Sequence, residues 1–567
     1  MNRPHRRVCS CRRVSGKLYS SLKTLYYHKT LIDCSHKQWA SAIEDDEGLR
    51  RCQTTQFICP MLELQGAYWP GQQQPAIHMT YNFKNTSYFI EKDGAMKTTN
   101  YDITIIGSGP GGYRAAVLAA LRGKKAAIIE TQTWGGTCLN RGCVPKKDWH
   151  ETAKWIEQSR HFEKRGVVGL ALTGDMAQAW QHQHKVVETV RASYVDYLKR
   201  LGVHLYNGTG HFLDPRRIQI QGAAGLTEIH TETSIIATGS VPSLPQGITT
   251  VPGKALTSDM LYDDGVPSGD RVIMVGGGVI GTEFAYIFTQ LGKQVEWLTH
   301  SPSLAHTRYS PQAKDTLKAA LAALNIHPQA GFKIARIETT AAGVTVFDDR
   351  GKSVQGDWLL LATGRHAFTE GLGLENTSVT LDDRGFVQTN TMLETEESGI
   401  YAIGDAVGPI MNANQALNDA QIVIHNLLSA EKQERDPLWV PELVYSAVEL
   451  ARIGMDDDAA EDLGFEPAVG FAAFETSPRA LGQDDSVGFV RLLADMDSGE
   501  LLGGEIVGRD AGELIHLLAS SGNRDEALRK IVETRVNHPS RAEELVNAAE
   551  TLAARWGLEE QIFGTTD

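Results

Sequence analysis

Long hydrophobic runs are missing from this chain: no apolar stretch approaches the roughly 20 residues that a membrane-spanning helix needs. A positive charge excess is missing too, and the formal net charge of −14 would repel nucleic acid and anionic membrane surfaces. The hydrophobic content of 42% and charged content of 22% are ordinary for a soluble globular protein. We therefore expect the 567 residues to form three or four domains of a soluble protein that binds neither nucleic acid nor membranes.

Cysteine is scarce in most of the chain. Five of the seven cysteines lie in the first 95 residues, so that only Cys138 and Cys143 remain in everything that follows. In the first group, Cys9-Ser-Cys11 lacks a second ligand pair at the spacing of a zinc site, and we predict no metal site. The isolated later pair needs a specific explanation.

The first part of the chain differs from the rest in charge. No acidic residue precedes Asp33, and residues 1–95 hold 13 Lys and Arg against 8 Asp and Glu. A basic stretch with interspersed Ser and Tyr is transit-peptide-like. Because no helical or strand period is sustained there, we predict that residues 1–97 are a disordered extension that the mature protein does not need. The expected location is cytoplasmic, or the mitochondrial matrix if this extension is a targeting segment.

A glycine motif stands in a strand–turn–helix context near residue 100. The apolar run 102–106 has the character of a buried parallel strand, and Gly107, Gly109 and Gly112 follow it before a helical stretch. Such glycines permit a tight turn and a close approach of backbone to a pyrophosphate. A second strand ends in Glu130, where a carboxylate can accept hydrogen bonds from a ribose. The whole arrangement predicts a dinucleotide site.

The same arrangement recurs later in the chain. The strand 271–275 precedes Gly276, Gly278 and Gly281, and the next strand ends at Thr299, as far from its first glycine as Glu130 is from Gly107. We therefore expect two dinucleotides. Neither the acid typical of NAD sites nor the Arg cluster typical of NADP sites is present at Thr299. Gly281 allows the close helix packing typical of NAD sites, so NAD is our prediction and NADP stays open.

The two isolated cysteines lie just after the first motif, in Gly135-Gly-Thr-Cys138-Leu-Asn-Arg-Gly-Cys143-Val-Pro-Lys-Lys147. At helical spacing both thiols could face one flavin. An attacking thiolate needs positive surroundings, which Arg141, Lys146 and Lys147 supply. The alternative, a pair of inert buried thiols, leaves their position beside a nucleotide motif without an explanation.

A proton-transfer pair is expected near the end of the chain, in His538-Pro-Ser-Arg-Ala-Glu543. Dithiol chemistry needs a group that exchanges a proton near neutral pH, and histidine, with an ordinary pKa of about 6.5, suits this best. Glu543 would orient the other ring nitrogen. The pair follows a predicted hairpin, residues 489–507, with a turn at Asp497-Ser-Gly499.

These motifs together resemble the flavoprotein disulfide reductase family, over residues 101 to about 560. The resemblance implies an α/β fold: two Rossmann-like dinucleotide-binding domains plus a C-terminal α+β dimerisation domain. It divides the chain into an FAD-binding domain in two parts, an NAD(P)-binding domain and an interface domain, at residues 98–247 with 373–432, 248–372 and 433–567. It also implies a homodimer with shared sites.

The resemblance assigns roles to single residues. Cys143 would contact the flavin, and Cys138 would exchange with substrate. Lys146 or Lys147 would pair with Glu283, and His538 with Glu543 would reach the partner's cysteines. The expected cofactor contacts are Gly107, Gly109, Gly112, Glu130, Gly136, Thr137, Lys147, Gly210, Thr238, Gly239, Gly276, Gly278, Gly281, Thr299, Gly364, Asp405 and Ala413.

Within the family the chain is most like dihydrolipoyl dehydrogenase. Gly281 and Met411-Asn-Ala413 favour that enzyme, whereas Val144-Pro-Lys-Lys147 and Tyr194 are closer to glutathione reductase. We predict FAD-dependent oxidation of dihydrolipoyl groups on a partner protein, with NAD as acceptor. The alternatives are NADPH-driven reduction of glutathione or a related small disulfide, and a non-catalytic docking subunit. The segments 365–369 and 445–449 depart from the family pattern, at a domain link and at the interface.

Overall fold

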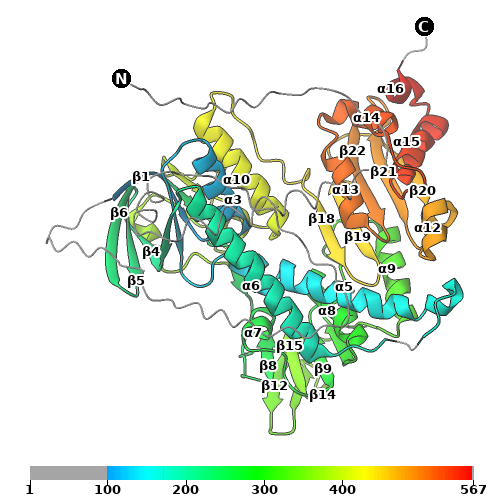
Figure 1. Cartoon of the computed structure of the whole chain (residues 1–567), viewed down its shortest axis with the longest axis horizontal. Coiled ribbons are helices and arrows are strands. Elements are labelled where there is room, and N and C mark those ends of the chain that lie inside the picture. The colour runs from blue at the N-terminus through cyan, green and yellow to red at the C-terminus, as the bar shows by residue number, and fades with distance from the viewer. Residues whose placement is uncertain (1–98, 170–171, 565–567) are drawn as a thin grey trace, which may run out of the picture. The chain divides into compact units, whose positions relative to one another are not determined.

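The computed structural model describes residues 99–169 and 172–564. They lie within one compact unit, Asp93–Asp567, built on three large sheets (Figure 1). The whole of the predicted basic extension, residues 1–97, and with it the five early cysteines, lies outside the described residues. None of the helices in the described ranges is long and apolar enough to cross a membrane. The predicted α/β fold with two Rossmann-like sheets and a C-terminal α+β domain is confirmed.

The first sheet has seven strands in the order β3-β2-β1-β6-β5-β4, with β17 beside β6. Its centre is parallel because β1 pairs with both β2 and β6 in the parallel sense, while β4 to β6 form an antiparallel meander. The central strands are buried, as their continuous Ile and Ala runs predicted. The strands are β1 Thr99–Ile106, β2 Ala126–Glu130, β3 His204–Asn207, β4 Thr209–Asp214, β5 Arg217–Gly222, β6 Gly225–Ile236 and β17 Ile400–Ala402.

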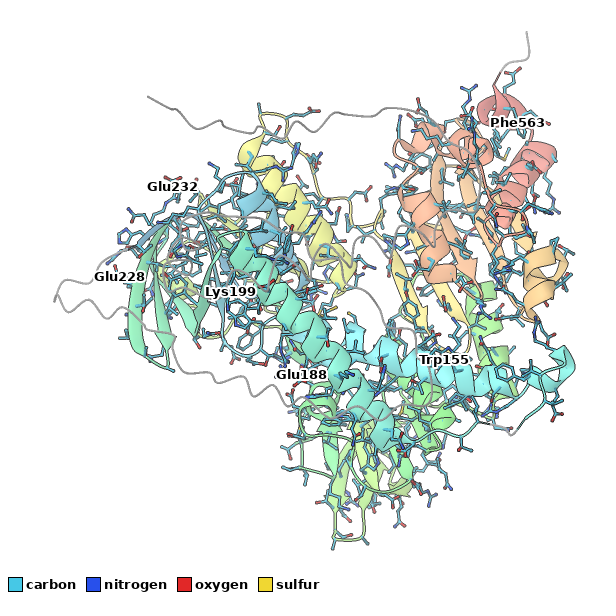
Figure 2. The ribbon with its side chains drawn as sticks, in the orientation of Figure 1. Trp155, Glu188, Lys199, Glu228, Glu232 and Phe563 are labelled. Carbon is cyan, nitrogen blue, oxygen red and sulfur yellow. The ribbon has the colours of Figure 1, made fainter. Side chains whose placement is uncertain are left out.

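Helices on and beside this sheet bring distant segments together. Figure 1 shows α3 and α10 next to each other, and these two helices are in contact. The long helix α5 buries Trp149 and Ala153 and exposes Trp155, which is labelled in Figure 2. It packs against α6, whose N-cap Asp175 accepts hydrogen bonds from the first turn. The helices are α3 Pro110–Leu121, α4 Gly136–Arg141, α5 Cys143–Ser159, α6 Met176–Arg200 and α10 Ala413–Leu428.

The second sheet repeats the parallel design. Its five strands run in the order β11-β10-β9-β15-β8 and all pair in the parallel sense. A short antiparallel meander, β12 Ile334–Thr339, β13 Val344–Asp348 and β14 Ser353–Gly356, accompanies it. The main elements are β8 Ala255–Thr257, α7 Ser258–Asp263, β9 Arg271–Val275, α8 Val279–Gln290, β10 Gln294–Thr299, α9 Pro311–Ala323, β11 Gln329–Ala330 and β15 Trp358–Leu361.

A two-stranded ribbon links the first two sheets. The strand β7, Ser240–Pro242, pairs with β16, Arg365–Ala367, in the antiparallel sense. Because β7 leaves the first sheet and β16 leaves the second, both connections between the sheets run side by side. The strand β16 forms the first part of the segment 365–369 that departs from the family pattern.

The third sheet is antiparallel, in the order β18-β19-β22-β21-β20. Its predicted hairpin is confirmed, with strands at 489–495 and 501–507. The helix α13 packs on β19 and β22, and α15 packs on β20 and β21. The elements are β18 Glu442–Tyr445, β19 Glu449–Gly454, α11 Asp457–Asp462, β20 Pro467–Ala473, α12 Pro478–Gln483, β21 Phe489–Asp495, β22 Leu501–Val507, α13 Ala511–Ala519, α14 Ala527–Glu533, α15 Glu543–Trp556 and α16 Glu559–Phe563.

Candidate functional site

The first glycine turn lies between β1 and α3, and each of its three glycines has a different reason to lack a side chain. A Cβ atom on Gly107, whose φ is +104°, would lie 2.3 Å from the carbonyl oxygen of Ala237. A Cβ on Gly112 would lie 1.9 Å from the carbonyl oxygen of Gly107. Gly109, by contrast, has open space around it. Two glycines therefore close the turn against backbone, and the third leaves the helix N-terminus free for a pyrophosphate.

The second glycine turn, between β9 and α8, repeats this geometry. A Cβ on Gly276 would lie 2.1 Å from the carbonyl oxygen of Ala362, and one on Gly281 would lie 2.1 Å from that of Gly276. Gly278 has open space around it, as Gly109 has. Both turns therefore fit a dinucleotide on grounds of backbone geometry alone.

The two turns differ where a ribose would bind. In the first, the carboxylate of Glu130 accepts hydrogen bonds from the amide and hydroxyl of Ser108, at 3.0 and 2.5 Å, and from the amide of Gln132 at 2.7 Å. In the second, Thr299 takes the place of Glu130 and is 0% exposed. Among the described residues its hydroxyl has no hydrogen-bond partner.

A cavity of about 1350 Å³ begins at the first glycine turn and reaches the two cysteines and helix α8. Its lining joins all three sheets, because Glu283 comes from α8 and Tyr445 from β18. The predicted cofactor contacts that line it are Gly107, Gly109, Glu130, Gly136, Thr137, Lys147, Gly210, Thr238, Gly239, Asp405 and Ala413. Those that do not line it are Gly112, Gly276, Gly278, Gly281, Thr299 and Gly364.

The two cysteines lie on different helices, although their spacing predicted a single helical face. Cys138 lies in α4 and Cys143 begins α5, because the chain breaks at Gly142, where φ is −138° and ψ is −108°. A Cβ on Gly142 would lie 3.2 Å from the carbonyl oxygen of Thr137. Glycine therefore lets the second helix begin close to the first, with both thiols free.

The pKa values of the two thiols are shifted in opposite directions. The hydrogen bond from Cys138, together with the ammonium groups of Lys147 and Lys146, lowers the pKa of Cys143 to about 7 against the effect of burial. The same hydrogen bond, together with burial, raises the pKa of Cys138. Cys143 is therefore the thiol that holds negative charge at neutral pH.

The charge beside Cys143 is anchored by one buried carboxylate. The side chain of Glu283 is 1% exposed, and its oxygens lie 2.6 Å from the Nζ of Lys146 and 3.1 Å from the Nζ of Lys147. The backbone amide of Tyr445 donates a third hydrogen bond, at 2.8 Å, and the Lys147 ammonium lies 4.2 Å from the centre of the Tyr445 ring. The two lysines hold the pKa of Glu283 at about 2 despite its burial.

A second acid, Asp405, lies half-buried at the ribbon between the sheets. The carboxylate of Asp405 accepts a hydrogen bond from the Ser240 hydroxyl at 2.6 Å, and burial raises the pKa of Asp405. Arg365 donates to the same hydroxyl at 2.8 Å and forms an ion pair with Asp259 at 3.0 Å. Arg365 therefore makes a domain link, although its segment departs from the family pattern.

The predicted proton-transfer pair is formed, but it lies away from the cysteines of its own chain. Nδ1 of His538 lies 2.8 Å from Oε1 of Glu543, and the amide of Ser540 donates to the same carboxylate at 2.6 Å. The hydrogen bond with His538 lowers the pKa of Glu543. The His538 side chain is 75% exposed, and neither member of the pair lines the cavity.

Sequence reasoning missed several contacts that position the site. It did not foresee Ser108 or Ser240 as partners of the two cavity acids, or Tyr445 as a donor to Glu283. Each of the two serines stands directly after a glycine of a motif that was recognised, which is a usable signal. The contact of Tyr445 arises from packing between distant segments and has no local signal. In the described residues no cluster of three or more His, Cys, Asp or Glu side chains could hold a metal ion.

Comparison with known families places these motifs in one group. Residues 101–420 match the model named pyridine nucleotide-disulphide oxidoreductase. Residues 440–549 match the model of the dimerisation domain of the same group.

Single relatives agree with the family models. The chain is 33% identical to a dihydrolipoyl dehydrogenase of Haloferax volcanii, over 80% of this chain and 96% of the relative. It is 29% identical to that of Bacillus subtilis, over 80% and 98%. Among solved structures, LpdA of Mycobacterium tuberculosis matches with a TM-score of 0.74 and 25% identity, over 80% of this chain and 100% of that one. The flavoprotein disulfide reductase RclA of Escherichia coli, solved as a Cu(II) complex, matches with a TM-score of 0.70 and 27% identity, over 80% and 99%.

Proposed function

Because the chain belongs to the pyridine nucleotide-disulphide oxidoreductase family, we propose that it oxidises dihydrolipoyl groups carried by a partner protein and reduces NAD. It is an enzyme of the group that contains the dihydrolipoyl dehydrogenases and RclA. The observation that carries the proposal is the Cys138 and Cys143 pair inside the cavity, where Lys146 and Lys147 lower the pKa of Cys143.

The cofactor sites follow from the two glycine turns. The first turn fits FAD: Gly109 would leave room for its pyrophosphate, and Glu130 and Asp405, which line the same cavity, would bind its ribose and the rest of the chain. The nicotinamide coenzyme fits the second turn at Gly278. When bound, the flavin and the nicotinamide supply the electron and hydride transfer that the side chains lack. In this assignment the first sheet holds FAD, the second holds the nicotinamide coenzyme and the third forms the interface.

The cysteines carry the exchange with substrate. In the oxidised protein, one dihydrolipoyl sulfur attacks Cys138, a mixed disulfide forms and Cys143 leaves as a thiolate. The second substrate sulfur then attacks the first, which closes the lipoyl disulfide and releases Cys138 as a thiol. Lys146 and Lys147 stabilise the Cys143 thiolate, and Glu283 holds these two lysines beside it.

Proton transfer is assigned to the partner subunit. We propose a homodimer in which the partner subunit's His538 accepts the proton of the attacking substrate thiol, while the partner's Glu543 orients the ring. Three observations support this: the pair is formed, His538 is exposed on its own chain, and the residues around it match a dimerisation domain. An exposed imidazole held by a carboxylate is available to a surface that approaches it.

The cavity argues against glutathione disulfide as substrate, because a glutathione site needs free cations for its carboxylates. The lining Lys and Arg side chains are nearly all engaged by acids of the same chain. Arg141 pairs with Asp263, and Arg308 with Glu442. The pairs of Lys146, Lys147 and Arg365 are those described above. Arg114 alone among the lining Lys and Arg of the described residues has no ion pair.

A steady-state assay in two arms tests the proposal. Purified protein loaded with FAD is assayed with dihydrolipoamide plus NAD, and in parallel with glutathione disulfide plus NADPH. Turnover confined to the first arm supports the proposed function. Turnover confined to the second makes the chain a glutathione-type reductase, and absence of turnover in both favours the docking subunit.

A further inference from the structure

The two glycine turns of this chain can be compared with each other position by position. They have the same spacing, since Glu130 and Thr299 stand equally far after the first glycine of their motifs. They also share the placement of all three glycines. Residues at equivalent positions of the two turns can therefore be compared directly.

The first turn contains a carboxylate that is held in a fixed position. Glu130 is 8% exposed, is fixed by three hydrogen bonds and lines the cavity. A carboxylate at the end of the second strand of such a unit selects a ribose with a free 2′-hydroxyl, because it accepts a hydrogen bond from that group. It also repels a 2′-phosphate, since both carry negative charge.

The second turn lacks this carboxylate and the serine that holds it. A Cβ on Gly277, which stands where the first turn has Ser108, would lie 3.3 Å from both the Cβ and the methyl carbon of Thr299. Thr299 is fully buried, so it presents nothing to a ribose. The position that provides a carboxylate for the ribose in the first turn provides no hydrogen-bonding group for a ribose in the second.

No other carboxylate takes over this role in the adjoining loop. The loop 300–306 folds onto the glycine turn, because the amide of Leu304 donates to the carbonyl of Gly277 at 2.7 Å. It contains no Asp or Glu but does contain His300 and His306. A 2′-phosphate therefore meets no negative charge from this loop, and a 2′-hydroxyl gains no carboxylate acceptor.

We infer that the second unit does not discriminate between NAD and NADP through the ribose, and that both bind with affinities within about tenfold of each other. The inference rests on the proposed function only in taking the second glycine turn as the nicotinamide site. Binding then depends on the pyrophosphate at the N-terminus of α8, which the two coenzymes share.

Calorimetry on the oxidised, FAD-loaded protein tests this without turnover. The probes are ADP-ribose, 2′-phospho-ADP-ribose, NAD and NADP, each titrated alone. Dissociation constants within about tenfold between the members of each pair support the inference, and a larger preference in either direction overturns it. If no probe binds, the assignment of the nicotinamide site fails, and the proposed function fails with it.

Two variants locate the cause. Thr299→Glu restores the carboxylate, and it should weaken NADP binding at least about tenfold relative to NAD binding. Gln294→Glu adds the same charge at the opposite, exposed end of β10 and should leave the ratio unchanged. An unchanged ratio in folded Thr299→Glu would show that this position does not set coenzyme choice. If that variant does not fold, the wild-type titrations still decide the inference.

Discussion

The thiol pair and the proton-transfer pair are built in opposite ways. Cys138 and Cys143 lie inside a cavity, where Glu283 fixes two lysines beside them. The His538 and Glu543 pair lies outside the cavity of its own chain, and the His538 side chain is 75% exposed. A thiolate at neutral pH needs fixed positive charge, which one chain provides by itself. The difference indicates that the chain fixes the charge beside its own thiols, whereas it presents the proposed proton-transfer group outward.

The largest expected effect comes from removing the thiolate. Cys143→Ser should lower turnover with dihydrolipoamide by more than about 10³-fold, because the group that leaves and stores charge is lost. Flavin content and thermal unfolding should stay close to wild type, since serine fills nearly the same volume. Turnover within tenfold of wild type would refute the redox pair.

Removing the exposed imidazole of His538 should lower activity less than Cys143→Ser does, but the loss should still be large. His538→Gln should lower kcat/KM by about 10²- to 10⁴-fold, the usual contribution of a positioned acid or base. The limb of the pH–rate profile that reports this base should disappear. His516→Gln, an exposed histidine on α13 of the same domain, is the matched control and should behave as wild type. Equal losses in both variants would assign the effect to surface charge.

The carboxylate that anchors the lysines should matter for stability. Glu283→Gln leaves a buried carboxylate site without its charge beside the buried ammonium of Lys146 and the partly exposed ammonium of Lys147, and it should lower the free energy of unfolding by about 3 kcal/mol. Glu188→Gln on the outer face of α6, labelled in Figure 2, removes a half-exposed partner of His184 and should cost less than about 1 kcal/mol. Chemical denaturation of the two variants measures both values. Similar small losses would show that Glu283 does not anchor the site.

The smallest expected effect is a shift in titration. Cys143 has a folded pKa of about 7, below its ordinary value of 9. In the dithiol form its thiolate therefore contributes stability that is fully present above pH 9 and is lost as the pH falls through 7. Lys147→Met should raise the Cys143 pKa by about one unit, read from thiolate absorbance under anaerobic conditions.

A control on the same helix sharpens that titration. Lys154 pairs with Glu449 and not with Glu283, so Lys154→Met should leave the thiolate midpoint unchanged. A shift of equal size in both variants would show that general charge on α5, rather than the ammonium of Lys147, sets the pKa of Cys143.

The sequence was sufficient for what depends on local pattern. The buried strands of both parallel sheets, their glycine turns and the hairpin at 489–507 are all found where the residues predicted them. Two features were not accessible. The five-residue spacing of the cysteines predicted one helical face, but the break at Gly142 depends on how α4 packs. Local pattern also left open which lysine pairs with Glu283, because α5 and α8 meet only in the folded chain. In the structure both Lys146 and Lys147 pair with it.

Complementation between inactive variants tests most directly whether the two halves of a site come from different chains. Cys143→Ser and His538→Gln proteins, each inactive alone, are mixed, dissociated and reassociated. Since half of the dimers are then mixed and each holds one intact site, activity should recover to about a quarter of wild type. A mixture of Cys143→Ser with Cys138→Ser should recover no activity, because each chain of the mixed dimer then lacks one cysteine of its own thiol pair. Mixed dimers of the first pair that form but stay inactive would contradict the shared site.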